Sequence, residues 1–350
     1  MKAAVFVGGR TLEFQEFPDP TPGPGEVVLE IKASGMCGSD LKFYRAQAGG
    51  AGAAALGLGA NTGPVIAGHE PCGVVAAIGD GVSEREATIG DRVMVHHYKG
   101  CGVCNHCRVG WSQMCDDTFV VYGVTGHGAH APYMKVPAST LVPLPDPLSF
   151  ETGAAISCGT GTAYGALKRL DLSGRDAIAI FGQGPVGLSA TQLAANMGAR
   201  VIAVDISDER LDFAKRLGAD HVINSGADDP VEAVKQLTAG YGVEKALDCS
   251  GAAEARAQAV KSTRAWGTVC FVGEGGDVTL DVSSDLIRKQ MTIVASWTFS
   301  AVGQAECARY VADRKIDVDG LFTHRYRLEQ AEEAYTLFDT QTTGKGVFLF

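Results

Sequence analysis

The chain has 350 residues, which is enough for two domains of ordinary size and for cores that need no disulfides. Hydrophobic residues make up 46% and charged residues 20%, a globular composition that excludes a disordered chain or a coiled coil. With 30 basic and 40 acidic side chains the net charge is -10, so we expect no polyanion-binding surface and no nucleic-acid partner.

The N-terminal sequence indicates neither export nor membrane insertion. Met1–Val7 is too short for a secretory signal and has no cleavage site. The uncharged stretch Ala46–Gly68 consists mostly of Gly and Ala, which predicts a loop and not a membrane span. The 10 cysteines, without an export signal, indicate a reducing compartment in which thiols bind metal more often than they pair. We therefore expect a cytoplasmic protein with no membrane partner.

Residues 1–150 are expected to form a β-rich domain. Short runs rich in β-branched residues and bounded by Gly or Pro predict strands at Lys2–Val7, Val27–Lys32, Gly73–Ile78, Arg92–Val95 and Tyr133–Val136. Such a series favours an irregular β-barrel or a sandwich. The Pro-dense segment Val142–Pro147 is expected to end this pattern.

Residues from about 151 to 296 show a different pattern of hydrophobic residues. Short apolar runs predict strands at Ala177–Gly182, Arg200–Asp205, His221–Asn224, Lys245–Gly251 and Gly267–Gly273. Helical stretches such as Val186–Met197 and Asp208–Leu217 separate them. The alternation predicts an α/β domain with a doubly wound parallel sheet. The last residues, from about 297 to 350, contain a predicted helix (Glu329–Phe338) and strand (Val347–Phe350) and are expected to return to the first domain.

A glycine motif follows the first strand of the predicted parallel sheet. Gly182, Gly184 and Gly187 form G-Q-G-P-V-G, with Pro185 and Val186 before the last glycine. The first glycine allows a tight turn, the second lets the backbone approach a pyrophosphate, and the third lets helix pack on strand. The helix N-terminus then attracts phosphate, so the motif predicts a dinucleotide site.

Asp205 ends the next predicted strand and determines which dinucleotide we expect. A carboxylate there accepts hydrogen bonds from the ribose hydroxyls and repels a 2′-phosphate, which favours NAD over NADP. The alternative is that Asp205 caps the following helix. Arg210 and Val272, near this strand end and the end of the last predicted strand, are further candidate cofactor contacts.

Four cysteines lie close together in a Gly-rich stretch. Cys101, Cys104, Cys107 and Cys115 form C-x2-C-x2-C-x7-C, which can surround one tetrahedral ion and leave no open coordination position. The spacing predicts a structural zinc, with an iron–sulfur cluster or four unrelated thiols as the alternatives.

Three further residues gain meaning from a resemblance. Cys37 in G-M-C-G-S-D, His69 in A-G-H-E-P and Cys158 in A-I-S-C-G-T are not connected by composition or periodicity. With the cysteine quartet and the glycine motif, in this order, they closely resemble the zinc-dependent alcohol dehydrogenases of the medium-chain dehydrogenase/reductase family. The resemblance covers essentially the whole chain. It implies a GroES-like, irregular β-barrel catalytic domain (1–150 and about 297–350) and a Rossmann NAD-binding domain (about 151–296).

The resemblance also implies roles for residues at the metal. Cys37, His69 and Cys158 match the ligands of the catalytic zinc, which leaves a fourth position for water or substrate. Glu70 is similar to an acidic neighbour that approaches the metal during exchange. Asp40 matches a carboxylate that orients the histidine ligand.

Residues implied for proton transfer and cofactor binding follow in the same way. Ser39 matches the first member of a proton relay, and Thr162 a position beside the nicotinamide. Lys345 matches a basic residue that contacts cofactor phosphate. Lys42 stands where many relatives have a histidine, and a lysine is a poor proton acceptor at neutral pH unless it is desolvated. Lys42 is therefore a candidate only.

These observations lead to one expected activity with named alternatives. We expect two zinc ions per chain, NAD, and reversible oxidation of a primary or secondary alcohol to an aldehyde or ketone. A polyol, sugar-alcohol or amino-alcohol substrate is the alternative, against which Cys158 speaks weakly, since polyol dehydrogenases often have glutamate there. The resemblance further implies a homotetramer or homodimer. The Gly/Ala-rich loop, residues 46–63, is expected to be a lid or substrate wall, or a neutral insertion.

Overall fold

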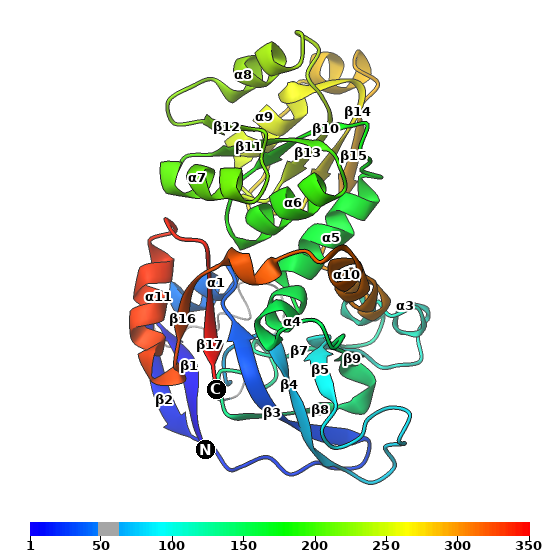
Figure 1. The fold of residues 1–350 in the computed structure, drawn as a ribbon, viewed down its shortest axis with the longest axis vertical. Helices are drawn as coiled ribbons and strands as arrows, with labels where there is room; N and C mark the ends of the chain where they lie inside the picture. Colours follow the sequence, from blue (N-terminus) through cyan, green and yellow to red (C-terminus); the bar gives the residue numbers. More distant parts are fainter. Residues whose placement is uncertain (48–62) are drawn as a thin grey trace. The chain divides into compact units, whose positions relative to one another are not determined.

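The computed structural model describes residues 1–47 and 63–350 and divides into two compact units (Figure 1). Unit 1 contains Met1–Cys158, Ser300–Gln341 and Lys345–Phe350, and unit 2 contains Gly159–Phe299 and Thr342–Gly344. Within the described ranges, no helix is both long enough and apolar enough to cross a bilayer. The expected lid or substrate wall falls mainly on residues 48–62, which lie outside the described residues.

Unit 1 is built on a mixed sheet with the strand order β16-β17-β3-β4-β5-β9, and β8 pairs with β3. Its strands are β1 (Lys2–Gly8), β2 (Thr11–Glu16), β3 (Glu26–Gly35), β4 (Glu70–Ile78), β5 (Arg92–Val95), β6 (Tyr98–Lys99), β7 (Val120–Val121), β8 (Tyr133–Pro137), β9 (Leu141–Pro143), β16 (Phe322–Tyr326) and β17 (Lys345–Leu349). Its helices are α1 (Asp40–Tyr44), α3 (Asn105–Arg108), α4 (Phe150–Ile156), α10 (Ala301–Arg314) and α11 (Ala331–Asp339).

The antiparallel pairing of β3 with β4 positions the centre of unit 1. Val27, Leu29 and Ile31 alternate along β3 with less buried residues and enter one apolar core with Val75 of β4. At the other end of the pair, Gly35 lies opposite Glu70. The residues that follow β3 and precede β4 are therefore brought to the same edge of the sheet.

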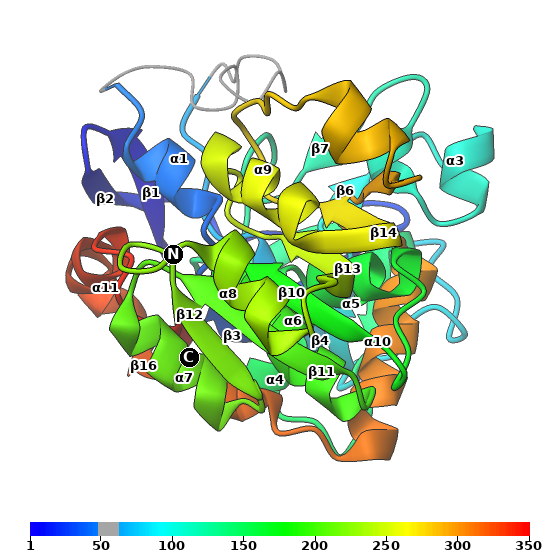
Figure 2. The same ribbon diagram turned by 90° about the horizontal axis from the view of Figure 1, so that it is seen from above.

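Unit 2 is a parallel sheet with the strand order β12-β11-β10-β13-β14-β15. The strands are β10 (Ala177–Phe181), β11 (Arg200–Asp205), β12 (His221–Asn224), β13 (Val243–Asp248), β14 (Thr263–Phe271) and β15 (Thr292–Ala295). The helices are α5 (Gly159–Arg169), α6 (Pro185–Asn196), α7 (Asp208–Arg216), α8 (Pro230–Leu237) and α9 (Ala253–Ser262). Figure 2 shows α8 and α9 on one face of the sheet and α6 and α7 on the other. The chain reverses its strand order between β10 and β13, as in a Rossmann fold.

The predicted fold class is confirmed, because the chain contains a β-rich unit and a unit built on a doubly wound parallel sheet. The strand pattern ends within Val142–Pro147, as expected, although β9 (Leu141–Pro143) still includes the first two of these residues and α4 follows. Proline is tolerated there since β9 is the last strand of its sheet within residues 1–47 and 63–350, so that one row of its N–H groups pairs with no strand in these ranges.

Candidate functional site

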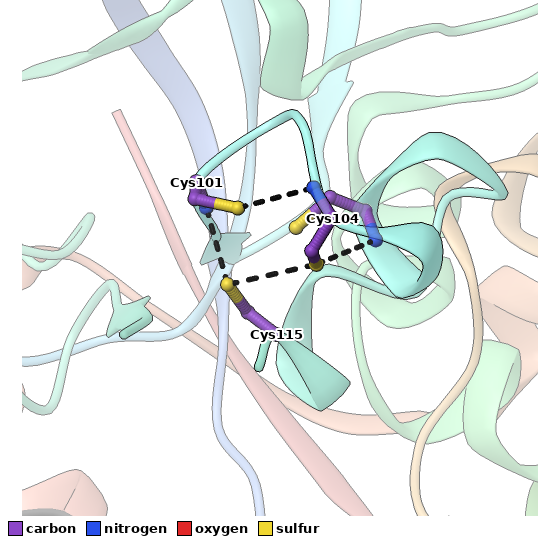
Figure 3. A group of neighbouring side chains, drawn as sticks. Cys101, Cys104 and Cys115 are labelled. Carbon is purple, nitrogen blue, oxygen red and sulfur yellow. Dashed lines mark hydrogen bonds between the residues drawn. The ribbon is translucent and has the colours of Figure 1, made fainter. Parts of the chain in front are cut away.

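The four cysteines of the quartet converge on one point at the surface of unit 1. Their sulfur atoms all lie within 4.8 Å of one another, and Sγ of Cys104 is 3.9 Å from Sγ of Cys115. A tetrahedral zinc with bonds of about 2.3 Å places its sulfurs about 3.8 Å apart. The N–H groups of Cys101, Cys104 and Cys107 donate to sulfurs of the group at 3.3–3.4 Å. Figure 3 shows Cys101, Cys104 and Cys115 gathered at this point. These residues fit a closed, structural zinc.

The backbone of this lobe prepares two of the thiols to bind a cation. Hydrogen bonds from backbone N–H groups hold the pKa of Cys104 below its usual value and lower that of Cys115 to about 6. Burial instead raises the pKa of Cys107 to about 12. Gly100 is required here because a Cβ at this position would lie 2.4 Å from Sγ of Cys107.

A second group forms at the edge where β3 ends and β4 begins. Cys37 follows β3, His69 and Glu70 stand at the start of β4, and Cys158 follows α4, which packs on both strands. One ligand atom from each lies within 4.8 Å of the others, and all four residues are buried. Sγ of Cys37 and Sγ of Cys158 are 3.9 Å apart, again the spacing of two zinc-bound sulfurs. The expected ligands thus fit one metal ion.

Charges around these two thiols favour one thiolate. The hydrogen bond with Cys158, together with His69 and Lys345, holds the pKa of Cys37 well below its usual value despite its burial. The same hydrogen bond, with burial, raises the pKa of Cys158. Metal binding requires both thiols as thiolates, so a dication bound here would displace the proton of Cys158.

His69 is oriented by Asp40, the first residue of α1. Its Nδ1 lies 2.8 Å from Oδ1 of Asp40, which leaves Nε2 as the ligand atom. Burial opposes a charged ring, but the carboxylate of Asp40 and hydrogen bonds with Asp40 and Cys37 outweigh it and raise the pKa of His69. Asp40 also accepts a hydrogen bond from the backbone N–H of Cys37 at 2.8 Å. One carboxylate thus orients two of the ligand residues.

The placement of Lys345 corrects its expected role. Its ammonium is 1% exposed, pairs with Oε2 of Glu70 and donates to the carbonyl of Met36 at 3.1 Å. A buried ammonium with these partners does not contact a cofactor phosphate. Glu70 remains beside the metal ligands, and burial, opposed by Lys345, raises its pKa to about 7.

Ser39 stands directly beside the metal ligands. Its Oγ lies 3.2 Å from Nε2 of His69, where a group bound to the metal would be within its reach. Lys42 follows within the same helical turn, and its backbone N–H donates to the carbonyl of Ser39 at 3.1 Å. Lys42 is half-buried on α1.

In unit 2 the glycine motif has the shape of a phosphate site. Gly182 has φ +88, and a Cβ on Gly187 would lie 1.7 Å from the carbonyl oxygen of Gly182. A Cβ on Gly184 would meet no protein atom within 4 Å, so this glycine leaves open space above the helix start. Pro185 is the first residue of α6, and no side chain caps the N–H groups of its first turn, including that of Val186. An anion can therefore bind them.

Asp205 is not the cap of the following helix, because Ser207 caps α7. The buried carboxylate of Asp205 instead accepts backbone N–H groups from Gln183, Ile206 and Ser207 at 2.5, 2.8 and 3.0 Å. It ties the glycine turn to the end of β11. A dinucleotide on the glycine motif would find this carboxylate at the adjacent strand end.

The remaining cofactor candidates of unit 2 lie on three elements. Arg210 lies on α7 and donates from Nε to the carbonyl of Thr343 at 3.4 Å. Val272 follows β14, and its N–H donates to the carbonyl of Asp248 at 2.9 Å. Thr162 is buried on α5. Their contact with a cofactor stays a prediction.

Sequence reasoning missed three buried residues near the metal group. His97 packs edge-on against His69, with ring centroids 5.3 Å apart, and its Nδ1 lies 2.8 Å from the carbonyl of Ser157. Tyr335 donates to Asp40 at 3.1 Å, and His130 contacts Tyr335 at 2.7 Å. No local motif marks them, because their partners are distant in sequence.

Comparison with known proteins finds a family model that matches each of the two units. Residues 23–146 match the model of the alcohol dehydrogenase GroES-like domain, and residues 185–314 match the model of the zinc-binding dehydrogenases. The chain is 42% identical to an uncharacterised zinc-type alcohol dehydrogenase-like protein of Escherichia coli K12, covering 100% of this chain and 99% of that one. It is 34% identical to L-threonine 3-dehydrogenase of Pyrococcus horikoshii (97% and 96% covered) and 31% identical to sorbitol dehydrogenase of Bacillus subtilis (95% and 92% covered).

Two solved structures superpose on this chain over its whole length. An alcohol dehydrogenase from Thermus sp. ATN1 superposes with a TM-score of 0.89 at 28% identity, covering 100% of this chain and 99% of that one. An alcohol dehydrogenase from E. coli CFT073, solved with NADH, gives a TM-score of 0.87 at 26% identity, with 100% and 99% covered.

Proposed function

This chain belongs to the zinc-binding alcohol dehydrogenase family, and we propose that it oxidises a primary or secondary alcohol reversibly to an aldehyde or ketone with NAD. The observation that carries the proposal is the convergence of Cys37, His69 and Cys158, with Glu70, on one point in unit 1. Two thiolates and one imidazole leave a coordination position open for substrate. The relative solved with NADH supports the choice of cofactor.

In unit 1, different residues bind the metal, orient its histidine ligand and transfer the proton. Cys37, Cys158 and Nε2 of His69 would hold the zinc, and Asp40 fixes the imidazole so that Nε2 can present its lone pair. Zinc, when bound there, supplies a Lewis acid that lowers the pKa of an alcohol hydroxyl. Oγ of Ser39, 3.2 Å from Nε2 of His69, accepts the proton that the alcohol loses and passes it on. Lys42, in the same helical turn as Ser39, is the candidate for the following position in the relay.

The residues of unit 2 bind the dinucleotide. The N–H groups at the start of α6, which no side chain caps, would bind the pyrophosphate, and Asp205 would accept hydrogen bonds from the ribose hydroxyls. NAD supplies the hydride acceptor. The fixed negative charge of Asp205 disfavours the 2′-phosphate of NADP.

The second candidate substrate is a polyol, sugar alcohol or amino alcohol. It is favoured by the relatives named for threonine and sorbitol, which match this chain over nearly its whole length. Cys158 favours the simpler alcohols. A single substrate panel separates the two proposals.

We also propose that the protein is a cytoplasmic homo-oligomer. β15 is the end strand of the parallel sheet, Ile293 on it is 39% exposed, and Trp297 just beyond it is 36% exposed. An apolar edge strand with free backbone groups favours pairing with a second copy. Light scattering of the zinc-loaded protein measures its molar mass in solution. The mass of a monomer would contradict the proposed homo-oligomer.

The proposed function is tested by following nicotinamide absorbance with NAD, and separately with NADP. The panel contains primary, secondary, cyclic and aromatic alcohols, polyols and 3-hydroxy amino acids, each with and without a chelator. Chelator-sensitive reduction of NAD by one class identifies the substrate. Reduction that survives complete removal of zinc overturns the proposal.

A further inference from the structure

A chain of hydrogen bonds runs through the interior of unit 1 and ends on Asp40. Tyr335 of α11 donates from Oη to Oδ2 of Asp40 at 3.1 Å. Nε2 of His130 lies 2.7 Å from Oη of Tyr335, and Oγ of Ser34 lies 2.8 Å from Nδ1 of His130. Ser34, His130 and Tyr335 are each 0% exposed. The four residues of this chain come from β3, a loop, α11 and α1, which are distant in sequence.

The direction of these hydrogen bonds follows from the number of protons available. Tyr335 has a single hydroxyl proton, and the carboxylate of Asp40 can only accept, so Oη must accept from His130. Burial lowers the pKa of His130 to about 4, so its ring is neutral and has one N–H, on Nε2. Nδ1 then accepts from the hydroxyl of Ser34. Every donor in the chain therefore points toward Asp40.

The backbone and packing fix each member in place. The N–H of His130 donates to the carbonyl of Ala67 at 2.8 Å, and its ring packs on Phe348 with centroids 4.7 Å apart. A Cβ on Gly68 would lie 2.3 Å from Nδ1 of His130, so the residue before His69 must be glycine for His130 to reach its partner. Phe6 packs edge-on against the ring of Tyr335, with centroids 4.9 Å apart.

We propose that Tyr335, His130 and Ser34 are positioning residues for the catalytic metal, which act through Asp40 on His69. Oδ2 of Asp40 accepts two hydrogen bonds, one from Oη of Tyr335 and one from the backbone N–H of Cys37. These two bonds turn the other oxygen, Oδ1, toward Nδ1 of His69. A tyrosine donor keeps the carboxylate in the rotamer that holds the imidazole with Nε2 toward the metal. Because Ser34 is fully buried, the chain has no solvent end and orients groups without carrying a proton out.

The proposal rests on the proposed function only in assigning zinc to Cys37, His69 and Cys158. Tyr335→Phe keeps the ring and removes the donor. Tyr44→Phe is the matched control, because Tyr44 lies in the same core cluster, 5.7 Å from the ring of Tyr335, and has no hydrogen bond to Asp40 or His130. The four-cysteine site serves as an internal control for folding.

The measurements are zinc affinity by competition with a chromophoric chelator, and the visible spectrum after cobalt(II) replaces zinc at the catalytic site. We expect Tyr335→Phe to weaken metal binding at this site about 3- to 10-fold and to shift the cobalt bands, below the 10- to 100-fold typical of direct partners of a ligand. Ser34→Ala, a smaller change at the far end, should produce a weaker shift of the same kind. Tyr44→Phe should leave both readouts as in the wild type.

A double variant tests whether the members act in series. If His130 acts through Tyr335, then His130→Gln adds no further loss of metal affinity in the Tyr335→Phe background. Additive losses, a cobalt spectrum unchanged by Tyr335→Phe, or equal loss of metal from the four-cysteine site overturn the positioning role while the proposed function stands. A wild-type chain that binds metal only at the four-cysteine site overturns both.

Discussion

The carboxylate of Glu70 and the ammonium of Lys345 form an ion pair that is enclosed on all sides, with 0% and 1% of the two side chains exposed. Gly35, opposite Glu70 in the sheet, leaves the necessary room, because a Cβ there would lie 2.0 Å from Oε2. The carbonyl of Met36 accepts a further proton of the ammonium at 3.1 Å. β3, β4 and β17 thus hold a charged pair beside the proposed metal ligands.

Lys345→Met is expected to destabilise the protein, because it leaves a buried carboxylate without its partner. Removal of one member of such a pair typically costs about 3–5 kcal/mol. The double variant Lys345→Met, Glu70→Gln removes the unpaired charge and should recover most of the loss. Urea unfolding of the zinc-loaded proteins measures both. A single variant as stable as the wild type but with a higher Kd for NAD would instead support contact with a cofactor phosphate.

The sequence predicts a strand with correct bounds where a short apolar run lies between residues that interrupt regular structure. Arg92–Val95, Arg200–Asp205 and His221–Asn224 are strands with the predicted bounds, because each is a short apolar run between breakers. β15 and α10 were not predicted. The residues of β15, Thr292–Ala295, are largely exposed at the edge of the sheet, so no buried pattern distinguishes them.

The site is predictable only in part, for a similar reason. The cysteine quartet lies within one short segment, and its spacing alone predicts a metal site. Cys37, His69 and Cys158 meet only through the pairing of β3 with β4 and the packing of α4, so single-sequence reasoning needed a family resemblance to connect them. Lys345 was assigned by position in the chain, whereas its partner Glu70 becomes evident only when β17 is placed beside β3.

Cys115→Ser is expected to remove one zinc per chain and leave the other. The serine oxygen is a poorer zinc ligand than a thiolate, and the closed site has no spare ligand. Zinc per chain, measured by atomic emission, should fall from two to one. Cys307→Ala, a buried thiol outside both metal groups, should retain two. Two zinc ions retained in Cys115→Ser would show that the quartet is not a metal site.

Asp205→Asn is expected to weaken NAD and to relax the discrimination against NADP. The amide cannot accept all three of the backbone N–H groups that the carboxylate accepts, and it has no charge to repel a 2′-phosphate. The KM for NAD should rise about tenfold, which corresponds to about 1.4 kcal/mol of lost binding. Steady-state kinetics with both cofactors measure the change.

Asp220→Asn is the matched control for this prediction. Oδ2 of Asp220 accepts the N–H of Val201 at 2.7 Å, at the opposite end of the same strand from Asp205. Its substitution should leave the ratio of the two KM values unchanged. An equal shift in both variants would mean that strand distortion, and not the carboxylate at the glycine turn, changes the cofactor preference.

The protein is expected to lose stability steeply on mild acidification because burial lowers the pKa of His97 as well as those of His96 and His130. Burial lowers the pKa of His96 and of His130 from 6.5 to about 4. Between these values the unfolded chain binds more protons than the folded protein, so the free energy of unfolding falls as the pH falls from 6.5 toward 4. Each histidine contributes up to about 1.4 kcal/mol per pH unit in this window.

Urea midpoints at pH 7, 6 and 5, with zinc in excess, measure this dependence. His96→Gln removes one of these groups and should make the decline shallower below pH 6.5, because glutamine takes up no proton in the unfolded chain. His221→Gln, at an exposed position on β12, should follow the wild-type curve. A decline in His96→Gln as steep as in the wild type would place the acid sensitivity in other groups, since any group that binds more protons in the unfolded chain than in the folded protein produces this sign.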